Sequence, residues 1–244
     1  MNVLLTGGSR GIGTAAVRAL HEAGASVVFT YNRESERAQA LCTELGSRVW
    51  AEQCDMANHD ALPALVDRAL EHLGSIDVLV NNAAIFAENP FFGTNYASWR
   101  AGWQQTFDVN FFGAANLTFL VLQHMRERKR GKILNIASRA AHRGELTYAD
   151  YGASKAALVN LTKSIARSCA KDGIVAIAIA PGFIETDMAA PDLDERGGAL
   201  AAEVPMGYVG KPEEVASIIS FFASDAANYA NGATIDVNGG SYVR

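Results

Sequence analysis

The chain has 244 residues, of which 49% are hydrophobic and 19% are charged. This length and apolar content suffice for a packed core and argue against an intrinsically disordered protein. The net charge of −5 gives no general reason to expect a nucleic acid or a membrane surface as partner. No stretch reaches the ~18 apolar residues of a membrane span, and the N-terminus lacks a signal-peptide pattern. We therefore expect a cytoplasmic protein.

The cysteines, Cys42, Cys54 and Cys169, are widely spaced and odd in number. They form no pair with the spacing of a metal site and suggest no disulfide framework. We interpret each of them as a small buried residue rather than as a ligand or a nucleophile. The sequence predicts no metal site.

Apolar runs of strand length alternate with segments of helical pattern along the chain. NVLL leads to a glycine-rich turn and a helix that begins near Gly11, and SVVFTY is followed by a charged helix over about 33–45. RVWAEQ precedes a helix over about 59–73, in which apolar residues recur at helical spacing. The remaining strands are expected at IDVLVNN, KILNIAS, IVAIAIA and ATIDV.

The expected strands are apolar on both faces, which indicates a parallel sheet covered by helices on both sides. No proline-rich linker or repeat interrupts the alternation, so we predict one doubly wound domain over residues 1–244. Two irregular segments, 85–98 and 181–205, each follow a strand, on the side where such sheets bind ligands. We expect 181–205 to form a mobile lid over the substrate.

The first strand runs directly into TGGSRGIG at 6–13. Gly7, Gly11 and Gly13 thus lie between a strand and a helix, where glycines permit a tight turn and close approach of the backbone to a phosphate. Turns also use glycine, so the pattern alone is weak. Its position between strand and helix favours a dinucleotide site.

Tyr151 and Lys155 are four residues apart in YADYGASKAAL, so they share one face of a predicted helix. A free tyrosine ionises near pH ~10 and is a poor acid or base at neutrality. A nearby ammonium favours the phenolate and would lower its pKa. The alternative is an ordinary surface contact. Ser138, thirteen residues upstream of Tyr151, ends the strand KILNIAS and favours a catalytic interpretation.

Together, these motifs resemble the short-chain dehydrogenase/reductase family over nearly the whole chain. The matching stretches agree in order and spacing: TGGSRGIG at 6–13, CDM at 54–56, NNAA at 81–84, VN at 109–110, IAS at 136–138, YGASK at 151–155, PGFIET at 181–186 and DVNGG at 236–240. The resemblance implies a Rossmann domain with a seven-stranded parallel sheet, order 3-2-1-4-5-6-7, and a homotetramer. Ala84 stands where the family usually has glycine; we expect a slight shift of the neighbouring loop.

The resemblance implies roles for four residues. Tyr151 would be the general acid–base for the carbonyl or alcohol oxygen, and Ser138 would hydrogen-bond the same oxygen. Lys155 would hold the nicotinamide ribose, and Asn110 would help position a water in the proton relay to the lysine. The cofactor would supply hydride, while the protein supplies orientation and proton transfer. Tyr148 is assigned to packing or to the pocket wall.

The expected cofactor is NADP(H) rather than NAD(H). An NAD site of this type has an acidic residue at the end of the second strand, whereas FTYNR ends this strand without one. Arg10 and Arg33 could together bind a 2′-phosphate; alternatively both are solvated, and Glu34 or Glu36 binds the ribose. The resemblance implies these cofactor-binding residues, with Asp55 at the adenine: Gly7, Ser9, Arg10, Gly11, Ile12, Gly13, Arg33, Asp55, Met56, Asn82, Ala83, Ala84, Tyr151, Lys155, Pro181, Gly182, Ile184 and Thr186.

The closest subgroup resemblance is to 3-oxoacyl-[acyl-carrier-protein] reductases, through APGFIETDM at 180–188 and the ending DVNGGSYV. It implies hydride transfer between nicotinamide and the carbonyl of a 3-oxoacyl thioester. A small diffusible ketone, aldehyde or sugar-like alcohol is the alternative substrate. A non-catalytic dinucleotide-binding regulator is the alternative of a different class, against which the complete set of four candidate catalytic residues argues.

Docking of an acidic carrier protein would need a basic surface. The candidate is the basic run Arg126, Arg128, Lys129, Arg130 and Lys132. The resemblance matches Lys129 to a carrier-contacting basic position, but places Asp172 where the subgroup has an arginine. The alternative is a solvated helix end.

Two further groups are interpreted as structural. His142 and Arg143 are expected in a solvated loop rather than at the edge of the substrate cleft. The aromatic group Phe91, Phe92, Tyr96, Trp99 and Trp103 is expected in core or subunit packing rather than in a substrate wall.

Overall fold

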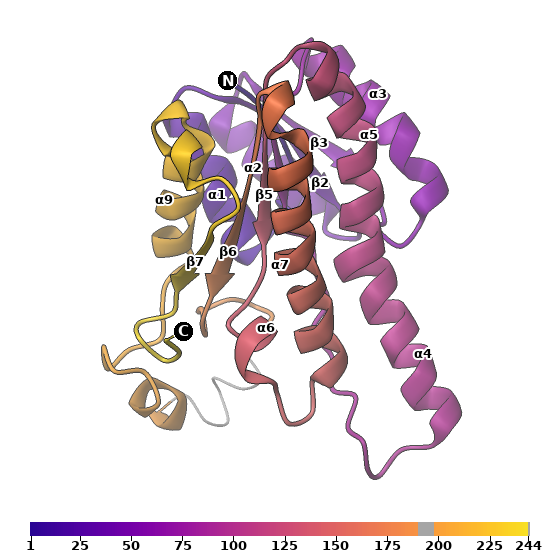
Figure 1. Ribbon diagram of the computed structural model, residues 1–244, viewed down its shortest axis with the longest axis vertical. Coiled ribbons are helices and arrows are strands. Elements are labelled where there is room, and N and C mark those ends of the chain that lie inside the picture. The colour runs from indigo at the N-terminus through magenta and orange to yellow at the C-terminus, as the bar shows by residue number, and fades with distance from the viewer. Residues whose placement is uncertain (190–197, 244) are drawn as a thin grey trace.

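The protein folds as the alternating pattern predicts. The computed structural model describes residues 1–189 and 198–243. Its sheet has seven strands in the order β3-β2-β1-β4-β5-β6-β7, and all neighbouring pairs are parallel (Figure 1). The strands are β1 Asn2–Leu5, β2 Ser26–Tyr31, β3 Val49–Gln53, β4 Val78–Asn81, β5 Gly131–Ile136, β6 Ile174–Pro181 and β7 Thr234–Val237.

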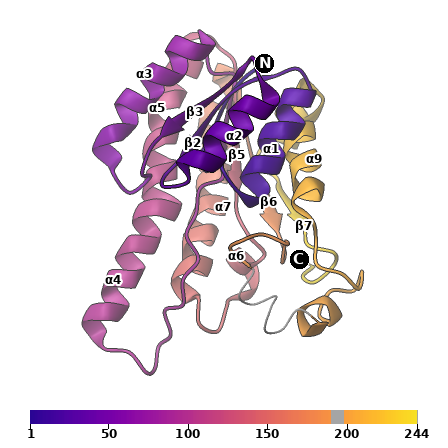
Figure 2. The same ribbon diagram turned by 180° about the vertical axis from the view of Figure 1, so that it is seen from behind.

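Helices cover both faces of this sheet. The α-helices are α1 Gly11–Glu22, α2 Ser35–Leu45, α3 Leu62–Leu73, α4 Tyr96–Phe107, α5 Ala114–Glu127, α6 Ala140–Arg143, α7 Ala149–Cys169 and α9 Pro212–Ala223. One apolar core joins α1, α2 and α9 to the sheet, and a second core joins α3, α5 and α7 to the opposite face (Figure 2). The two cores explain why the strands are apolar on both sides.

The helix boundaries differ in detail from the expectations. The charged helix begins at Ser35 rather than near Arg33, and a short 3₁₀ turn, η1 His59–Ala61, precedes α3. Two further short 3₁₀ segments are η3 Ala170–Asp172 and η4 Asp225–Ala230. Helices α4 and α5 are joined by a π-helical stretch, η2 Asp108–Gly113, and Figure 1 shows the three as one long rod.

The expected lid, 181–205, is described only in part, because 190–197 lie outside the described residues. Within the described part of the chain, no helix is long and apolar enough to cross a bilayer. The three cysteines are free thiols; Cys54 is buried, and Cys42 and Cys169 are partly buried. Among the described residues, no cluster of three or more His, Cys, Asp or Glu side chains could hold a metal ion.

The topology gathers the motifs at one edge. In a parallel sheet the carboxyl ends of β1, β4, β5 and β6 point the same way, so the residues that follow them meet. The turn after β1 is tied to the turn after β4, since the Thr6 hydroxyl accepts hydrogen bonds from the backbone N–H groups of Asn82 and Ala83, both at 3.0 Å. The Asn82 amide in turn donates to the carbonyl oxygens of Thr6, at 3.0 Å, and Gly7, at 2.9 Å.

Candidate active site

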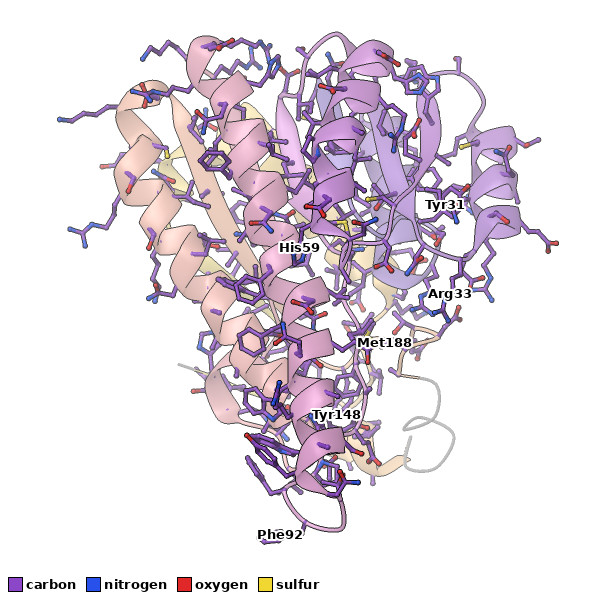
Figure 3. All side chains as sticks on the ribbon, turned by 90° about the vertical axis from the view of Figure 1, so that its right-hand side faces the viewer. Tyr31, Arg33, His59, Phe92, Tyr148 and Met188 are labelled. Carbon is purple, nitrogen blue, oxygen red and sulfur yellow. The ribbon has the colours of Figure 1, made fainter. Side chains whose placement is uncertain are left out.

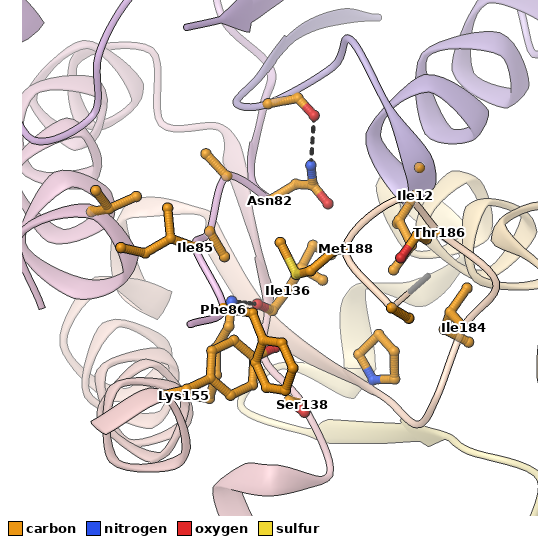
Figure 4. Close-up of a pocket in the computed structure, with 18 of the residues that line it drawn as sticks. Ile12, Asn82, Ile85, Phe86, Ile136, Ser138, Lys155, Ile184, Thr186 and Met188 are labelled. Atoms are coloured by element: carbon orange, nitrogen blue, oxygen red, sulfur yellow. Dashed lines mark hydrogen bonds between the residues drawn. The ribbon is translucent and has the colours of Figure 1, made fainter. Parts of the chain in front are cut away.

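A cleft of about 1150 Å³ opens at the carboxyl edge of the sheet (Figure 4). It is larger than the ~300–1,000 Å³ of ordinary ligand pockets, so a dinucleotide and a small substrate can share it. All eighteen residues that the motifs imply for cofactor binding line this cleft, and Ser138 lines it with them. Ala84 is among the eighteen, so its methyl group is accommodated in the cleft wall.

The glycine loop forms one end of the cleft. Gly7 has φ of 72°, in the left-handed region that favours glycine. A Cβ on Gly13 would lie 1.9 Å from the Gly7 carbonyl oxygen, so only glycine fits there. Helix α1 begins at Gly11, within the cleft lining, and its first N–H groups are available to an anion. The backbone therefore fits a dinucleotide pyrophosphate.

The residues after β2 form the part of the cleft next to this loop. Arg10 and Arg33 are exposed there, and neither forms an ion pair within residues 1–189 and 198–243. Glu34 also lines the cleft, but its carboxylate lies 3.7 Å from Arg37 Nε, and Arg37 also pairs with Asp187. Two unpaired guanidinium groups fit a 2′-phosphate, whereas the Glu34 carboxylate already has a cationic partner.

Ser138, Tyr151 and Lys155 meet where β5 ends. Helix α7 presents Tyr151 and Lys155 one turn apart, and the Tyr151 and Ser138 side chains are hydrogen-bonded to each other. The Lys155 ammonium donates to the carbonyl oxygen of Ile136 at 2.7 Å, a bond drawn in Figure 4, and lies 5.6 Å from the centre of the Tyr151 ring. The three side chains thus form one polar group inside a largely apolar wall.

Burial dominates the titration of both α7 groups. It raises the pKa of Tyr151 to about 12, against the lowering effect of the Ser138 hydrogen bond, and it lowers the pKa of Lys155 to about 7. The expected lowering of the tyrosine pKa by Lys155 is therefore not found, because desolvation disfavours the phenolate more strongly. At neutral pH Tyr151 is a phenol, which makes it a proton donor.

The depressed pKa of Lys155 predicts a pH-dependent stability. Between about pH 7 and the ordinary value of 10.5, the unfolded chain binds a proton that the folded chain does not, so the free energy of unfolding should rise with pH. Lys155→Met should abolish this rise, while Lys163→Met on the exposed side of α7 should retain it. Urea unfolding of the three proteins at several pH values measures the effect; parallel pH profiles for Lys155→Met and the parent would contradict it.

Asn110 lies behind the cleft rather than in its wall. It is fully buried in the π-helical stretch η2. Its side-chain oxygen accepts the Ile85 N–H at 2.8 Å, and its amide donates to the Ile85 carbonyl at 3.0 Å and to the Ser154 hydroxyl at 3.3 Å. Asn110 therefore anchors Ile85, which does line the cleft. Its role in a proton relay stays a prediction.

The aromatic predictions have mixed outcomes. Tyr148 does belong to the pocket wall, where its ring stacks on Phe86 with centroids 3.8 Å apart. The group Phe91, Phe92, Tyr96, Trp99 and Trp103 contributes nothing to the cleft lining that the structure describes. Figure 3 shows Phe92 at the far tip of the molecule, and Phe92 is 89% exposed. A core position is therefore wrong for Phe92, and subunit packing stays a prediction.

The prediction of a solvated loop after Ser138 is correct only in part, since Arg143 is exposed but the segment is helical. His142 and Arg143 belong to the short helix α6 rather than to a solvated loop, and Arg143 lines the cleft. Sequence reasoning also missed Arg139, a buried residue of the cleft wall. The available signal was a charged residue inside the apolar run NIASRAA, directly after Ser138.

The basic run lies at the opposite edge of the sheet, where β5 begins. Gly131 and Ser138 are separated by seven residues of nearly extended chain, about 23 Å at ~3.3 Å per residue. The side chains of the run already have partners: Lys129 and Arg126 pair with Asp172, Arg128 with Asp77, and Arg130 with Asp225, while buried Lys132 donates to the Ser224 carbonyl. The run is thus an exposed basic surface whose cations are paired, and its role in carrier docking stays a prediction.

Comparisons with known proteins agree with this geometry. Residues 7–242 match the family model described as "Enoyl-(Acyl carrier protein) reductase". The chain is 37% identical to a 3-oxoacyl-[acyl-carrier-protein] reductase of Vibrio cholerae, covering 98% of this chain and 96% of the relative. It is 38% identical to an acetoacetyl-CoA reductase of Rhizobium meliloti, covering 98% and 97%. A solved short-chain dehydrogenase/reductase from Brucella melitensis, titled a glucose/ribitol dehydrogenase, superposes with a TM-score of 0.90 at 34% identity, covering 99% and 96%.

Proposed function

Since the chain belongs to the short-chain dehydrogenase/reductase family, we propose that it is an NADP(H)-dependent reductase of 3-oxoacyl thioesters. It is an oxidoreductase that acts on a keto or hydroxyl group with a nicotinamide cofactor. The phosphorylated cofactor, the acyl substrate and the roles of the site residues are the proposal. The observation that carries it is the meeting of Ser138, Tyr151 and Lys155 at the end of β5, beside a glycine loop that fits a pyrophosphate.

The side chains have complementary tasks in this proposal. The Ser138 and Tyr151 hydroxyls, already hydrogen-bonded to each other, bind the substrate ketone oxygen from two sides. The Tyr151 phenol, which is protonated at neutral pH, donates its proton to that oxygen as the alcohol forms. Lys155 contacts the nicotinamide ribose and is held in place by the Ile136 carbonyl. When bound, NADPH supplies the hydride that no side chain can provide.

The cofactor residues are proposed in four sets, one for each part of the dinucleotide. The glycine loop and the start of α1 hold the pyrophosphate, and Arg10 with Arg33 holds the 2′-phosphate. Asp55 contacts the adenine, and the turns at Asn82 and Pro181 line the nicotinamide end. The Arg37 contact to Glu34 supports NADP(H), since it engages the carboxylate that an NAD site would need for the ribose.

The thioester substrate is inferred from the two relatives named for 3-oxoacyl and acetoacetyl thioesters. A panel assay tests it: loss of the reduced-nicotinamide absorbance with 3-oxoacyl thioesters, 2-enoyl thioesters, simple ketones and sugars. We expect the highest kcat/KM with the 3-oxoacyl thioester. A higher kcat/KM with a small ketone or a sugar would show that the substrate belongs to that class and not to the thioesters. Binding of NADPH without turnover of any compound would favour the non-catalytic regulator.

Docking of a carrier protein at the basic run is not part of the proposal, because its cations are paired and lie at the far edge of the sheet. Lys129→Glu combined with Arg130→Glu should therefore change the rates on a carrier-bound thioester and on its small analogue by the same factor. The assay belongs at low salt, where exposed charges act most strongly. A selective loss with the carrier-bound substrate would show that the run docks the carrier. The homotetramer and the cytoplasmic location stay predictions.

A further inference from the structure

Arg139 is a buried cation in the wall of the substrate cleft. It follows Ser138 directly, and its backbone N–H donates to the Pro181 carbonyl at 2.9 Å. The residue is 2% exposed, and its guanidinium carbon lies 4.5 Å from the centre of the Phe183 ring. Among the described residues, neither Nη1 nor Nη2 has a hydrogen-bond partner. Four N–H donors of this cleft-lining residue therefore lie buried without an acceptor in the described part of the chain.

Burying these unpaired donors costs folding free energy unless a ligand supplies their acceptor. A buried donor without an acceptor loses its hydration and gains nothing in return. Packing on Phe183 does not explain the residue, because an apolar side chain could fill the same space without this cost. A donor group in a ligand cleft has another explanation: the acceptor belongs to the ligand.

The surrounding charges indicate what kind of acceptor fits. Three charged side chains act on the guanidinium: Arg143, which disfavours its positive charge, and Glu145 and Glu203, which favour it. With Arg139 itself the group holds two cations and two anions, so its formal charge is already balanced. The site lacks an acceptor oxygen rather than a negative charge, which favours a neutral carbonyl over a free carboxylate.

We propose that Arg139 is a specificity-determining residue that donates hydrogen bonds to the thioester carbonyl oxygen of a 3-oxoacyl substrate. The inference rests on the proposed function. In such a substrate one methylene group separates the thioester carbonyl from the ketone. When the ketone oxygen lies at Ser138 and Tyr151, the second oxygen must lie close by, and Arg139 is the neighbour of Ser138 in the chain. A simple ketone has no second oxygen to offer.

The test compares two substrates that differ in this oxygen. Acetoacetyl-N-acetylcysteamine carries the thioester carbonyl, and the matched ketone, the thioether S-(3-oxobutyl)-N-acetylcysteamine, has a methylene group in its place. Arg139→Met removes the donors and keeps an unbranched apolar side chain. It should lower kcat/KM for the thioester about 10- to 100-fold, the range expected for losing a charge-assisted hydrogen bond. The value for the ketone should stay within about twofold. Arg167→Met, an exposed arginine of α7, is the matched control and should leave both substrates unchanged.

Several outcomes would overturn the inference. Equal losses on both substrates would mean that Arg139 positions Ser138 instead, and no loss on either would mean that it contacts no substrate. A third outcome is that the parent reduces acetoacetate faster than the thioester and that Arg139→Met loses this preference. Arg139 would then bind a carboxylate instead of a thioester carbonyl.

Folding and the proposed function are checked separately. The melting temperature and NADPH affinity of Arg139→Met report its folding. If it fails to fold, Arg139→Lys keeps the cation without the planar pair of donors. Arg139→Lys should lower kcat/KM for the thioester and not for the ketone. If kcat/KM relative to the parent is the same for both substrates, the inference is overturned. A parent protein that reduces no thioester at all would refute the proposed function, and this inference with it, before any variant is made.

Discussion

Replacing Tyr151 with phenylalanine should lower kcat about 10²- to 10⁴-fold, the usual contribution of a positioned general acid. The change removes only the hydroxyl that is hydrogen-bonded to Ser138 and leaves the ring packed edge-on against Phe86. The phenol, with its pKa raised to about 12, is protonated at neutral pH and is the proposed proton donor for the ketone oxygen. Steady-state kinetics with a 3-oxoacyl thioester and NADPH measure the loss.

Cofactor binding separates a catalytic loss from a folding defect. NADPH affinity, followed by nicotinamide fluorescence, should change by less than about twofold in Tyr151→Phe, because the hydroxyl contributes little to holding the dinucleotide. Tyr229→Phe, at a fully exposed tyrosine of η4, is the matched control and should have normal turnover. Near-normal kcat in Tyr151→Phe would remove Tyr151 from the proposed mechanism.

The second large effect should be on the choice of cofactor. Arg10→Ala combined with Arg33→Ala should lower kcat/KM for NADPH about 10- to 100-fold and change the value for NADH by less than about threefold. Each guanidinium can donate charge-assisted hydrogen bonds to a 2′-phosphate, and neither has an ion-pair partner in the described part of the chain. Steady-state kinetics measured in parallel with NADPH and NADH give the ratio of the two kcat/KM values.

The control for this experiment is Arg100→Ala, at an exposed arginine of α4 outside the described cleft lining. It should leave the ratio of the two cofactors unchanged. If the parent protein uses NADH as efficiently as NADPH, the two arginines are solvated side chains, and Glu34 becomes the candidate ribose ligand despite its contact with Arg37.

The backbone architecture and the gathering of the motif residues at one cleft could be predicted, because the architecture follows from local patterns and the motifs follow its strands. Strands apolar on both faces define a covered parallel sheet, and the loops after its strands must meet at one edge. The eighteen motif residues therefore reach one cleft although they are scattered from Gly7 to Thr186. The need for glycine at Gly13 agrees with this interpretation of the loop, since the turn brings the Gly7 carbonyl onto it.

What depends on burial and on distant partners could not be read from the sequence. The spacing of Tyr151 and Lys155 gives their proximity, but the direction of the tyrosine pKa depends on desolvation by the whole cleft wall. The ion pairs of the basic run could not be predicted, because the partners Asp77, Asp172 and Asp225 are remote in sequence. Arg139 resembles any surface arginine until the fold buries it against Phe183.

The central claim is that this cleft transfers hydride from NADPH to the ketone carbon of a 3-oxoacyl thioester. The most direct measurement uses NADPH deuterated at the nicotinamide C4 position, in both stereoisomers, with acetoacetyl-CoA and the purified protein. We predict that one of the two isomers places deuterium on the carbinol carbon of 3-hydroxybutyryl-CoA, detected by NMR, and that Tyr151→Phe suppresses this product. Consumption of NADPH without deuterium at that carbon, or no product with either isomer, would contradict the account.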